Sequence, residues 1–161
     1  MLRRHLDGLV ASLVAWPLAA VEQAVSVLDR ARRDGAEVFV LGNGGSAASA
    51  SHFACDLNKN TTVPGEPGFR VTCLCDNTAI LTALANDHGY DQVFAAQIRE
   101  RARPGDVVVA ISTSGASENV LRAAEVGREA GATTMGWSGA GPTPLADLVD
   151  VAVEVANSDV A

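Results

Sequence analysis

Two short stretches rich in glycine, serine and threonine hold the residue types best suited to chemistry in this sequence. They are Gly42-Asn43-Gly44-Gly45-Ser46 and Ser112-Thr113-Ser114-Gly115-Ala116-Ser117. Each follows an apolar run typical of a buried strand and precedes a run typical of a helix. Such turns expose backbone N–H groups and hydroxyls beside a helix N-terminus, where the helix dipole favours negative charge and glycine lets a ligand approach closely. Together they predict a phosphate site built from neutral donors.

Two simpler interpretations fit parts of these turns. A serine such as Ser46 or Ser117 is a common helix N-cap, but a cap explains neither the several hydroxyls of the second turn nor the presence of a second similar turn. The pattern Gly42-x-Gly44-x-x-Ala47 also matches a dinucleotide fingerprint, which requires an acidic residue about 20 positions further on. The nearest candidate, Asp76, lies considerably farther along the chain. We therefore expect a phosphate ester as ligand and no nucleotide cofactor.

His52 and Asp56 form a second candidate group, on the helix expected after the first turn. Their spacing of four residues puts both side chains on one helix face, one turn apart. A carboxylate beside an imidazole can transfer protons, ligate a metal ion or form an ordinary surface ion pair, and the spacing leaves these alternatives open.

A third polar cluster, Asn86-Asp87-His88-Gly89-Tyr90, follows the second expected strand. It could reach the same edge of the sheet as the two turns. Alternatively, Asn86 and Asp87 could simply end a helix.

Composition and charge exclude several classes of protein. The 161 residues, 48% of them hydrophobic, predict one domain with a substantial core. A net charge of −7 argues against a nucleic-acid partner, because phosphate-backbone binding depends on clustered Lys and Arg. No apolar run reaches the roughly 18 residues that a membrane span needs, and Asp7 interrupts the only stretch resembling a signal peptide. The three cysteines lack metal-site spacing, which favours a reducing, cytoplasmic compartment.

Apolar periodicity predicts an N-terminal helix pair followed by alternating strands and helices. The expected helices cover residues 2–16, 18–34, 46–58, 78–86, 91–101, 117–129 and 145–148; the expected strands cover 38–41, 69–75, 107–111, 133–137 and 151–155. Continuous apolar strands between helices are typical of a parallel sheet covered on both faces, which makes the fold class α/β. Ligands of such sheets bind beyond the carboxyl ends of the strands, where both turns lie.

Three segments resemble the SIS (sugar isomerase) domain, specifically the phosphoheptose isomerase family. They are GNGGSA with the following HFA (42–47 and 52–54), LTALANDHGYDQVF (81–94) and RPGDVVVAISTSGASENVLRA (103–123). With the helix pair, the resemblance covers essentially the whole chain as one SIS domain over 1–161, with a helical pair over 1–34 and an α/β core over 35–161. It implies a three-layer α/β/α sandwich around a five-stranded parallel sheet in flavodoxin-like order. It also implies a homotetramer with active sites at subunit contacts.

The resemblance further implies an activity and roles for individual residues. The implied reaction isomerises sedoheptulose 7-phosphate to D-glycero-D-manno-heptose 7-phosphate through an enediol, which needs a carboxylate base and an acid or metal to stabilise the oxyanion. Asp56 and His52 correspond to the family's site of proton transfer, where members can also hold zinc. The residues implied to bind phosphate and sugar are Asn43, Gly44, Ser46, Asp87, Ser112, Thr113, Ser114 and Ser117.

The sequence departs from the family pattern in two places. Asp56 stands where the family usually has glutamate, and a misplacement of about 1 Å can lower a rate roughly a hundredfold. Family members also continue into a further helix with a glutamine and a histidine, which we expect to be absent from a sequence that ends at Ala161. Two hypotheses follow: an aldose–ketose isomerase, and a non-catalytic SIS module that binds a phosphosugar or acts as an interaction scaffold.

Overall fold

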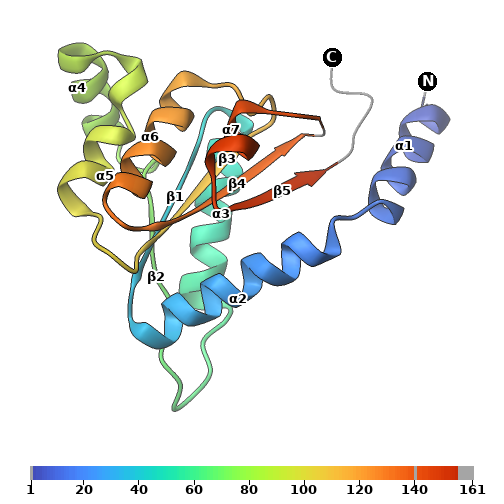
Figure 1. Ribbon diagram of the computed structural model, residues 1–161, viewed down its shortest axis with the longest axis horizontal. Coiled ribbons are helices and arrows are strands. Elements are labelled where there is room, and N and C mark those ends of the chain that lie inside the picture. Colours follow the sequence, from blue (N-terminus) through green and yellow to red (C-terminus); the bar gives the residue numbers. More distant parts are fainter. Residues whose placement is uncertain (1, 140, 156–161) are drawn as a thin grey trace.

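A five-stranded sheet in the order β2-β1-β3-β4-β5 runs through the structure, and every neighbouring pair of strands is parallel (Figure 1). The computed structural model describes residues 2–139 and 141–155. Its strands are β1 (Glu37–Gly42), β2 (Arg70–Cys73), β3 (Val107–Ser112), β4 (Thr133–Gly139) and β5 (Val151–Val155). β2 is shorter than the expected 69–75 because the chain turns after Cys73, whose carbonyl accepts a hydrogen bond from the Asp76 N–H.

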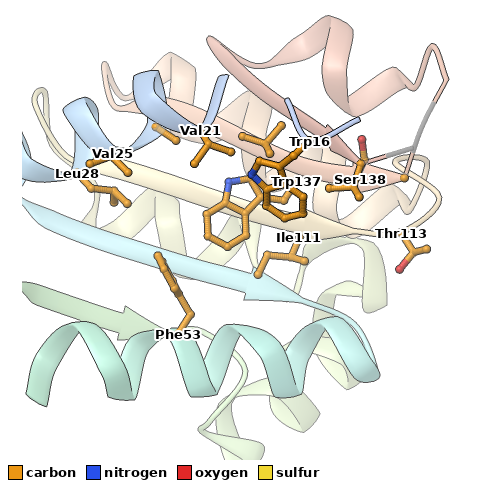
Figure 2. A pocket seen from close by; sticks show the side chains of 13 residues that line it. Trp16, Val21, Val25, Leu28, Phe53, Ile111, Thr113, Trp137 and Ser138 are labelled. Atoms are coloured by element: carbon orange, nitrogen blue, oxygen red, sulfur yellow. The ribbon is translucent and has the colours of Figure 1, made fainter. Parts of the chain in front are cut away.

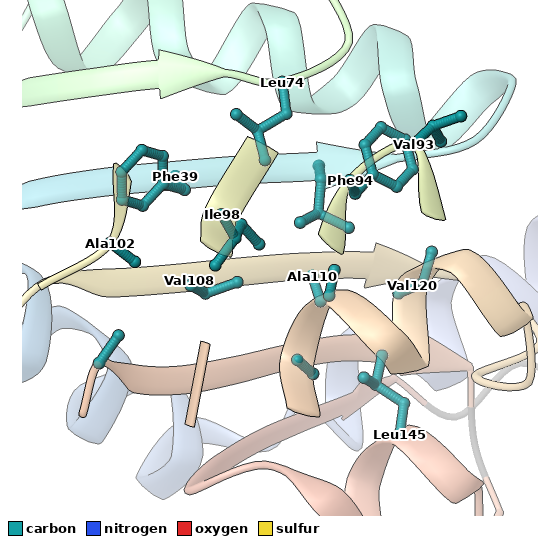
Figure 3. Close-up of a cluster of buried hydrophobic side chains, with 14 residues drawn as sticks. Phe39, Leu74, Val93, Phe94, Ile98, Ala102, Val108, Ala110, Val120 and Leu145 are labelled. Atoms are coloured by element: carbon teal, nitrogen blue, oxygen red, sulfur yellow. The ribbon is translucent and has the colours of Figure 1, made fainter. Parts of the chain in front are cut away.

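Helices cover both faces of this sheet, because successive side chains of each strand point to opposite faces. Val38 and Val40 of β1 pack with α2 (Leu18–Asp34) and α3 (Gly45–Lys59). Phe39 and Leu41 pack instead into the cluster shown in Figure 3. That cluster includes side chains from α5 (Ala95–Arg101), α6 (Glu118–Glu129) and α7 (Pro144–Leu148), with α4 (Thr78–His88) against its rim. The expected three-layer α/β/α sandwich is confirmed, and so is the flavodoxin-like strand order.

The segment after α4 differs from the sequence-based expectation. The helix expected over 91–101 is divided into the 3₁₀ turn η1 (Tyr90–Gln92) and α5. The Gln92 and Val93 N–H groups donate to the carbonyls three residues earlier, at Gly89 and Tyr90, and this tighter turn brings Val93 fully into the core. α4 also extends to His88, so Asn86 and Asp87 lie inside that helix and do not end it.

The N-terminal helix α1 (Leu2–Val14) has no buried residues and extends away from the sheet (Figure 1). A break of a few residues with Pro17 joins it to α2, and the two helices are bent by 63°. Within the described residues, no single helix is long and apolar enough to cross a membrane. Only α1 and α2 taken together meet that test of length and composition.

Asp106 connects the amino ends of β1 and β3. Its carboxylate accepts one hydrogen bond from the Glu37 N–H and another from the Arg103 N–H, each at 2.8 Å. The Asp106 side chain is buried, and both hydrogen bonds are at least partly buried with it. This contact holds the two central strands together at the edge of the sheet opposite their carboxyl ends.

We predict that Asp106→Ala lowers the free energy of unfolding by about 3 kcal/mol, because it leaves two backbone N–H groups without partners. Urea unfolding followed by circular dichroism measures this change. Asp34→Ala, an exposed position at the end of α2, is the matched control and should change stability by less than about 0.5 kcal/mol. Equal stability of the Asp106 variant and the wild type would contradict the assignment.

Candidate functional site

The two glycine- and hydroxyl-rich turns meet at the carboxyl edge of the sheet. β1 and β3 are adjacent and parallel, with Gly42 opposite Ile111, so the segments that follow them emerge side by side. Between the turns lies a cavity of about 240 Å³, called here the polar cavity. It is lined by Asn43, Ser46, Ile111, Ser112, Thr113, Ser114 and Ser117. The structure thus brings together all the sequence-predicted binding residues except Gly44 and Asp87.

The turns are packed so closely that position 42 accepts only glycine. A Cβ atom built on Gly42 would lie 2.8 Å from the Ser46 Cβ and 2.9 Å from the Ile111 carbonyl oxygen. Gly44 has a φ of 54° with open space around it. Its contribution is therefore backbone conformation, which turns the chain from β1 into α3 without a steric penalty.

The serine hydroxyls of the polar cavity are not used as helix caps. Ser117 immediately precedes α6 but makes no side-chain cap hydrogen bond, and α3 also begins without one. The Ser112 and Ser117 Oγ atoms lie 3.3 Å apart, and Ser114 Oγ accepts a weak hydrogen bond of 3.3 Å from the Ala116 N–H. Capping therefore does not account for these serines, whose hydroxyls line the cavity.

A pair of asparagine side chains connects the two turns. Asn43 Nδ2 donates to Asn119 Oδ1 at 2.8 Å, and Asn119 Nδ2 donates to Asn43 Oδ1 at 2.9 Å. The Tyr90 hydroxyl donates to the same Asn43 oxygen at 3.0 Å. Tyr90 belongs to the polar cluster expected from the sequence, whereas Asn119 is not among the predicted site residues. An asparagine in the first turn of a helix carries no signal that it bonds to a distant loop.

No positive charge lines the polar cavity in the described part of the chain. An anion there would be held by neutral donors and by the N-terminal dipoles of α3 and α6. Arg122, in the second turn of α6, is engaged by two carboxylates: Glu118 at 2.9 Å and Asp91 at 3.1 Å. The pKa of Asp91 is lowered, first by the hydrogen bond from Gln92 and to a smaller extent by the charge of Arg122.

The thiols of Cys73, at the end of β2, and of Cys75, two residues later, lie near the first turn. The Cys75 thiol donates to the Gly42 carbonyl at 3.2 Å. A hydrogen bond between the Cys73 and Cys75 side chains lowers the pKa of Cys75 and, together with burial, raises that of Cys73. Both side chains pack in the core cluster that contains Val38 and Val40, and neither lines the polar cavity.

His52 and Asp56 form the contact that their spacing predicts, but they lie away from the polar cavity. His52 Nε2 is 3.2 Å from Asp56 Oδ2, and their side chains are 79% and 41% exposed. With a rise of about 1.5 Å per residue, Asp56 lies about 15 Å along α3 from Ser46. Asp87 is likewise exposed and accepts a hydrogen bond from Asn86 at 2.8 Å. The roles of His52, Asp56 and Asp87 stay predictions.

A zinc ion would need more ligands than this pair supplies. Among the described residues, no group of three or more His, Cys, Asp and Glu side chains could hold a metal ion. Catalytic zinc sites use three protein ligands. The described residues of one copy therefore do not complete a zinc site.

A second, larger cavity of about 530 Å³ lies beside the first and shares Ile111 and Thr113 with it (Figure 2). It is formed mainly by apolar side chains of the junction between α1 and α2, of α2 itself, of α3 and of the strands. Phe53 and Trp137 meet there edge to face, with ring centroids 4.9 Å apart. Among the described residues, hydroxyls and an amide line the polar cavity, whereas the lining of this apolar cavity offers few polar groups, so the polar cavity is the better candidate for a phosphorylated ligand.

Comparison with known proteins places the chain in a family. Residues 4–139 match the family model described as the SIS domain. The phosphoheptose isomerase of Rhodospirillum rubrum is 41% identical over 141 residues, which are 84% of this chain and 72% of that protein. The chain belongs to the phosphoheptose isomerase family of SIS domains. The resemblance found in the sequence is thereby confirmed.

Two further comparisons show how much of the length of its relatives the chain spans. The phosphoheptose isomerase of Mycobacterium tuberculosis is 46% identical over 127 residues, 79% of this chain, and the chain spans 64% of that relative. A solved structure of a phosphoheptose isomerase from Francisella tularensis superposes with a TM-score of 0.89 at 26% identity, covering 99% of this chain and 84% of that one. The fold is thus shared over 99% of the chain, and the chain spans 64% and 84% of the lengths of these two relatives.

We predict that Ser112→Ala and Ser114→Ala each weaken the binding of inorganic phosphate about tenfold, because each removes a hydroxyl donor to a charged group. Isothermal titration calorimetry measures the affinity. Ser49→Ala is the control: its hydroxyl bonds to the Gly45 carbonyl on the exposed side of α3, outside the polar cavity. Unchanged affinity in both cavity variants would show that phosphate binds elsewhere.

Proposed function

We propose that this chain is an aldose–ketose isomerase that converts sedoheptulose 7-phosphate to D-glycero-D-manno-heptose 7-phosphate. The observation that carries the proposal is the polar cavity of neutral donors at the joined ends of β1 and β3. It occurs in a chain 41% identical to a phosphoheptose isomerase. A phosphate held by these turns fixes the distance from the ester to the carbonyl carbon, and so selects which carbons meet the catalytic base.

The proposed reaction moves one proton between neighbouring carbons of the sugar. A base removes a proton from C1 of the ketose, the electrons form the C1–C2 double bond, and the C2 carbonyl oxygen takes up a proton to give the enediol. Return of a proton to C2 and loss of the proton from O1 then produce the aldehyde. Asp56 is the proposed base and His52 its neighbour, with the ring nitrogen 3.2 Å from the carboxylate.

This assignment requires two copies of the chain. Within one copy, Asp56 lies about 15 Å along α3 from Ser46 of the polar cavity. The His52 side chain is exposed and that of Asp56 is partly exposed, as expected for side chains that would complete the cavity of a neighbouring copy. The active site is therefore proposed to form at a contact between subunits.

Helix α1 supplies the surface for the proposed homotetramer. Its apolar residues lie on one face, following the three- and four-residue spacing of a helix, and nothing in the described chain covers them. The members of this stripe, each more than half exposed, are Leu2, Leu6, Leu9 and Leu13. A contiguous exposed apolar surface of this kind is typical of a protein–protein interface.

The double variant Leu6→Glu/Leu13→Glu is expected to shift the protein toward smaller species, because it puts charge into the apolar stripe. Sedimentation velocity gives the distribution of masses. Arg4→Glu/Ala11→Glu, on the opposite face of α1, is the matched control and should leave the assembly intact. A wild-type chain that sediments as a monomer would contradict the proposed assembly.

Turnover of sedoheptulose 7-phosphate is expected, and Asp56→Ala is expected to lower kcat by about a hundredfold or more because it removes the base. Formation of the aldose is followed by NMR, with and without added zinc. Asp34→Ala is the control carboxylate. Phosphate affinity should not change in the Asp56 variant.

Two outcomes would change this assignment. Normal turnover by the Asp56 variant would show that another group is the base. A wild-type chain that binds the phosphosugar but gives no aldose under either condition would favour the non-catalytic SIS module.

Zinc and the compartment are two further parts of the proposal. If zinc raises turnover, His52 and Asp56 are its proposed ligands, with the remaining ligands supplied from outside the described residues of one copy.

The three cysteines are free thiols, which supports a reducing, cytoplasmic compartment.

A further inference from the structure

We propose that Asn119 and Tyr90 are positioning residues, which hold the Asn43 side chain so that it can only donate a hydrogen bond to the bound phosphosugar. The inference rests on the proposed function for the identity of that ligand. The geometry of the three side chains carries it.

Among the described residues, the hydrogen bonds of the Asn43 side chain leave one polar group of its amide without a partner. Its Oδ1 accepts from Asn119 Nδ2 at 2.9 Å and from the Tyr90 hydroxyl at 3.0 Å, which occupies both lone pairs of an amide oxygen. One of the two Nδ2 hydrogens is donated to Asn119 Oδ1 at 2.8 Å. The second Nδ2 hydrogen is therefore the remaining polar contact that this side chain can offer to the cavity that it lines.

The orientation of this amide decides its effect on an anionic ligand. A terminal amide rotates easily about χ2 and, without partners, can present either its oxygen or its nitrogen. An amide oxygen facing a phosphate or enediolate oxygen would repel it, whereas a donor already in place stabilises the charge without reorganising. The hydrogen bonds accepted by Oδ1 also polarise the amide and strengthen the remaining N–H donor.

Asn119 is the rigid member of this network. Its side chain is 3% exposed, and it stands on α6 next to the core residue Val120. Tyr90 is 60% exposed and reaches Asn43 from η1 through its terminal hydroxyl. The loss of Asn119 is therefore expected to affect ligand binding more than the loss of the Tyr90 hydroxyl.

The network joins three segments that are distant in the sequence. Asn43 follows β1, Asn119 lies in the helix after β3, and Tyr90 follows α4. A purely structural role in joining these segments is the alternative. Asn58 offers a comparison, because its amide also makes two hydrogen bonds, with the Val71 carbonyl at 2.9 Å and the Val71 N–H at 3.1 Å, but lies outside the polar cavity.

The test is a double-mutant cycle read by calorimetric binding of sedoheptulose 7-phosphate. Asn119→Ala is expected to weaken affinity about tenfold and Tyr90→Phe about threefold, the range for loss of one hydrogen bond. In an Asn43→Ala background, neither change should weaken binding further, because both act through Asn43. Asn58→Ala should lower the melting temperature but leave affinity unchanged.

Several results would overturn the inference. One is unchanged affinity in Asn119→Ala with only a lower melting temperature. Another is an equal loss of affinity with and without Asn43. If Asn119→Ala does not fold, the cycle of Tyr90→Phe with Asn43→Ala decides, since it removes only an exposed hydroxyl.

Binding and turnover separate this inference from the proposed function. A chain that binds sedoheptulose 7-phosphate without isomerising it contradicts the proposed reaction, and the binding cycle still decides the roles of Asn119 and Tyr90. A wild-type chain that does not bind this sugar phosphate overturns both.

Discussion

The site depends on the close approach of two strand ends. Gly42 and Ile111 are register partners in adjacent parallel strands, and a side chain at position 42 would collide with both the Ile111 carbonyl and Ser46. Because glycine at position 42 has no side chain, β1 and the start of α3 can approach β3 this closely. α3 therefore begins directly beside the turn that follows β3. Two helix N-termini and two rows of hydrogen-bond donors consequently face one small cavity. The rest of the candidate site is built around that spacing.

The polar cavity is suited to hold an anion although the protein as a whole is acidic. The chain carries a net charge of −7, and among the residues that the structure describes no charged side chain lines the cavity. Its side-chain donors are hydroxyls and an amide, on residues whose positions are set by the fold. Arg122 lies one turn into α6 but is paired with Glu118 and Asp91. Specificity would therefore come from the positions of neutral donors, and the Asn43–Asn119 pair is one means of fixing such a position.

Within a single copy of the chain, the proposed phosphate site and the proposed proton-transfer pair lie apart. The two turns of the polar cavity lie at the carboxyl edge of the sheet, whereas His52 and Asp56 lie further along α3, with side chains that solvent reaches. α1 at the same time exposes an apolar stripe that contacts nothing in the described chain. Association between copies would cover the apolar stripe and would also bring Asp56 of one copy to the polar cavity of another. In this proposal, assembly and catalysis are linked by geometry.

The sequence by itself determined the fold class, the strand order through family resemblance, and the two turns that form the polar cavity. These follow from local signals: apolar periodicity, and glycine with hydroxyl residues after a strand. Only the tertiary structure decided that Asn43 meets Asn119, 76 residues away in the chain. It also decided the early end of β2 and the division of 91–101 at η1. Each depends on which segments pack together and at what angle, a cooperative result of the whole core that spacing along one segment does not encode.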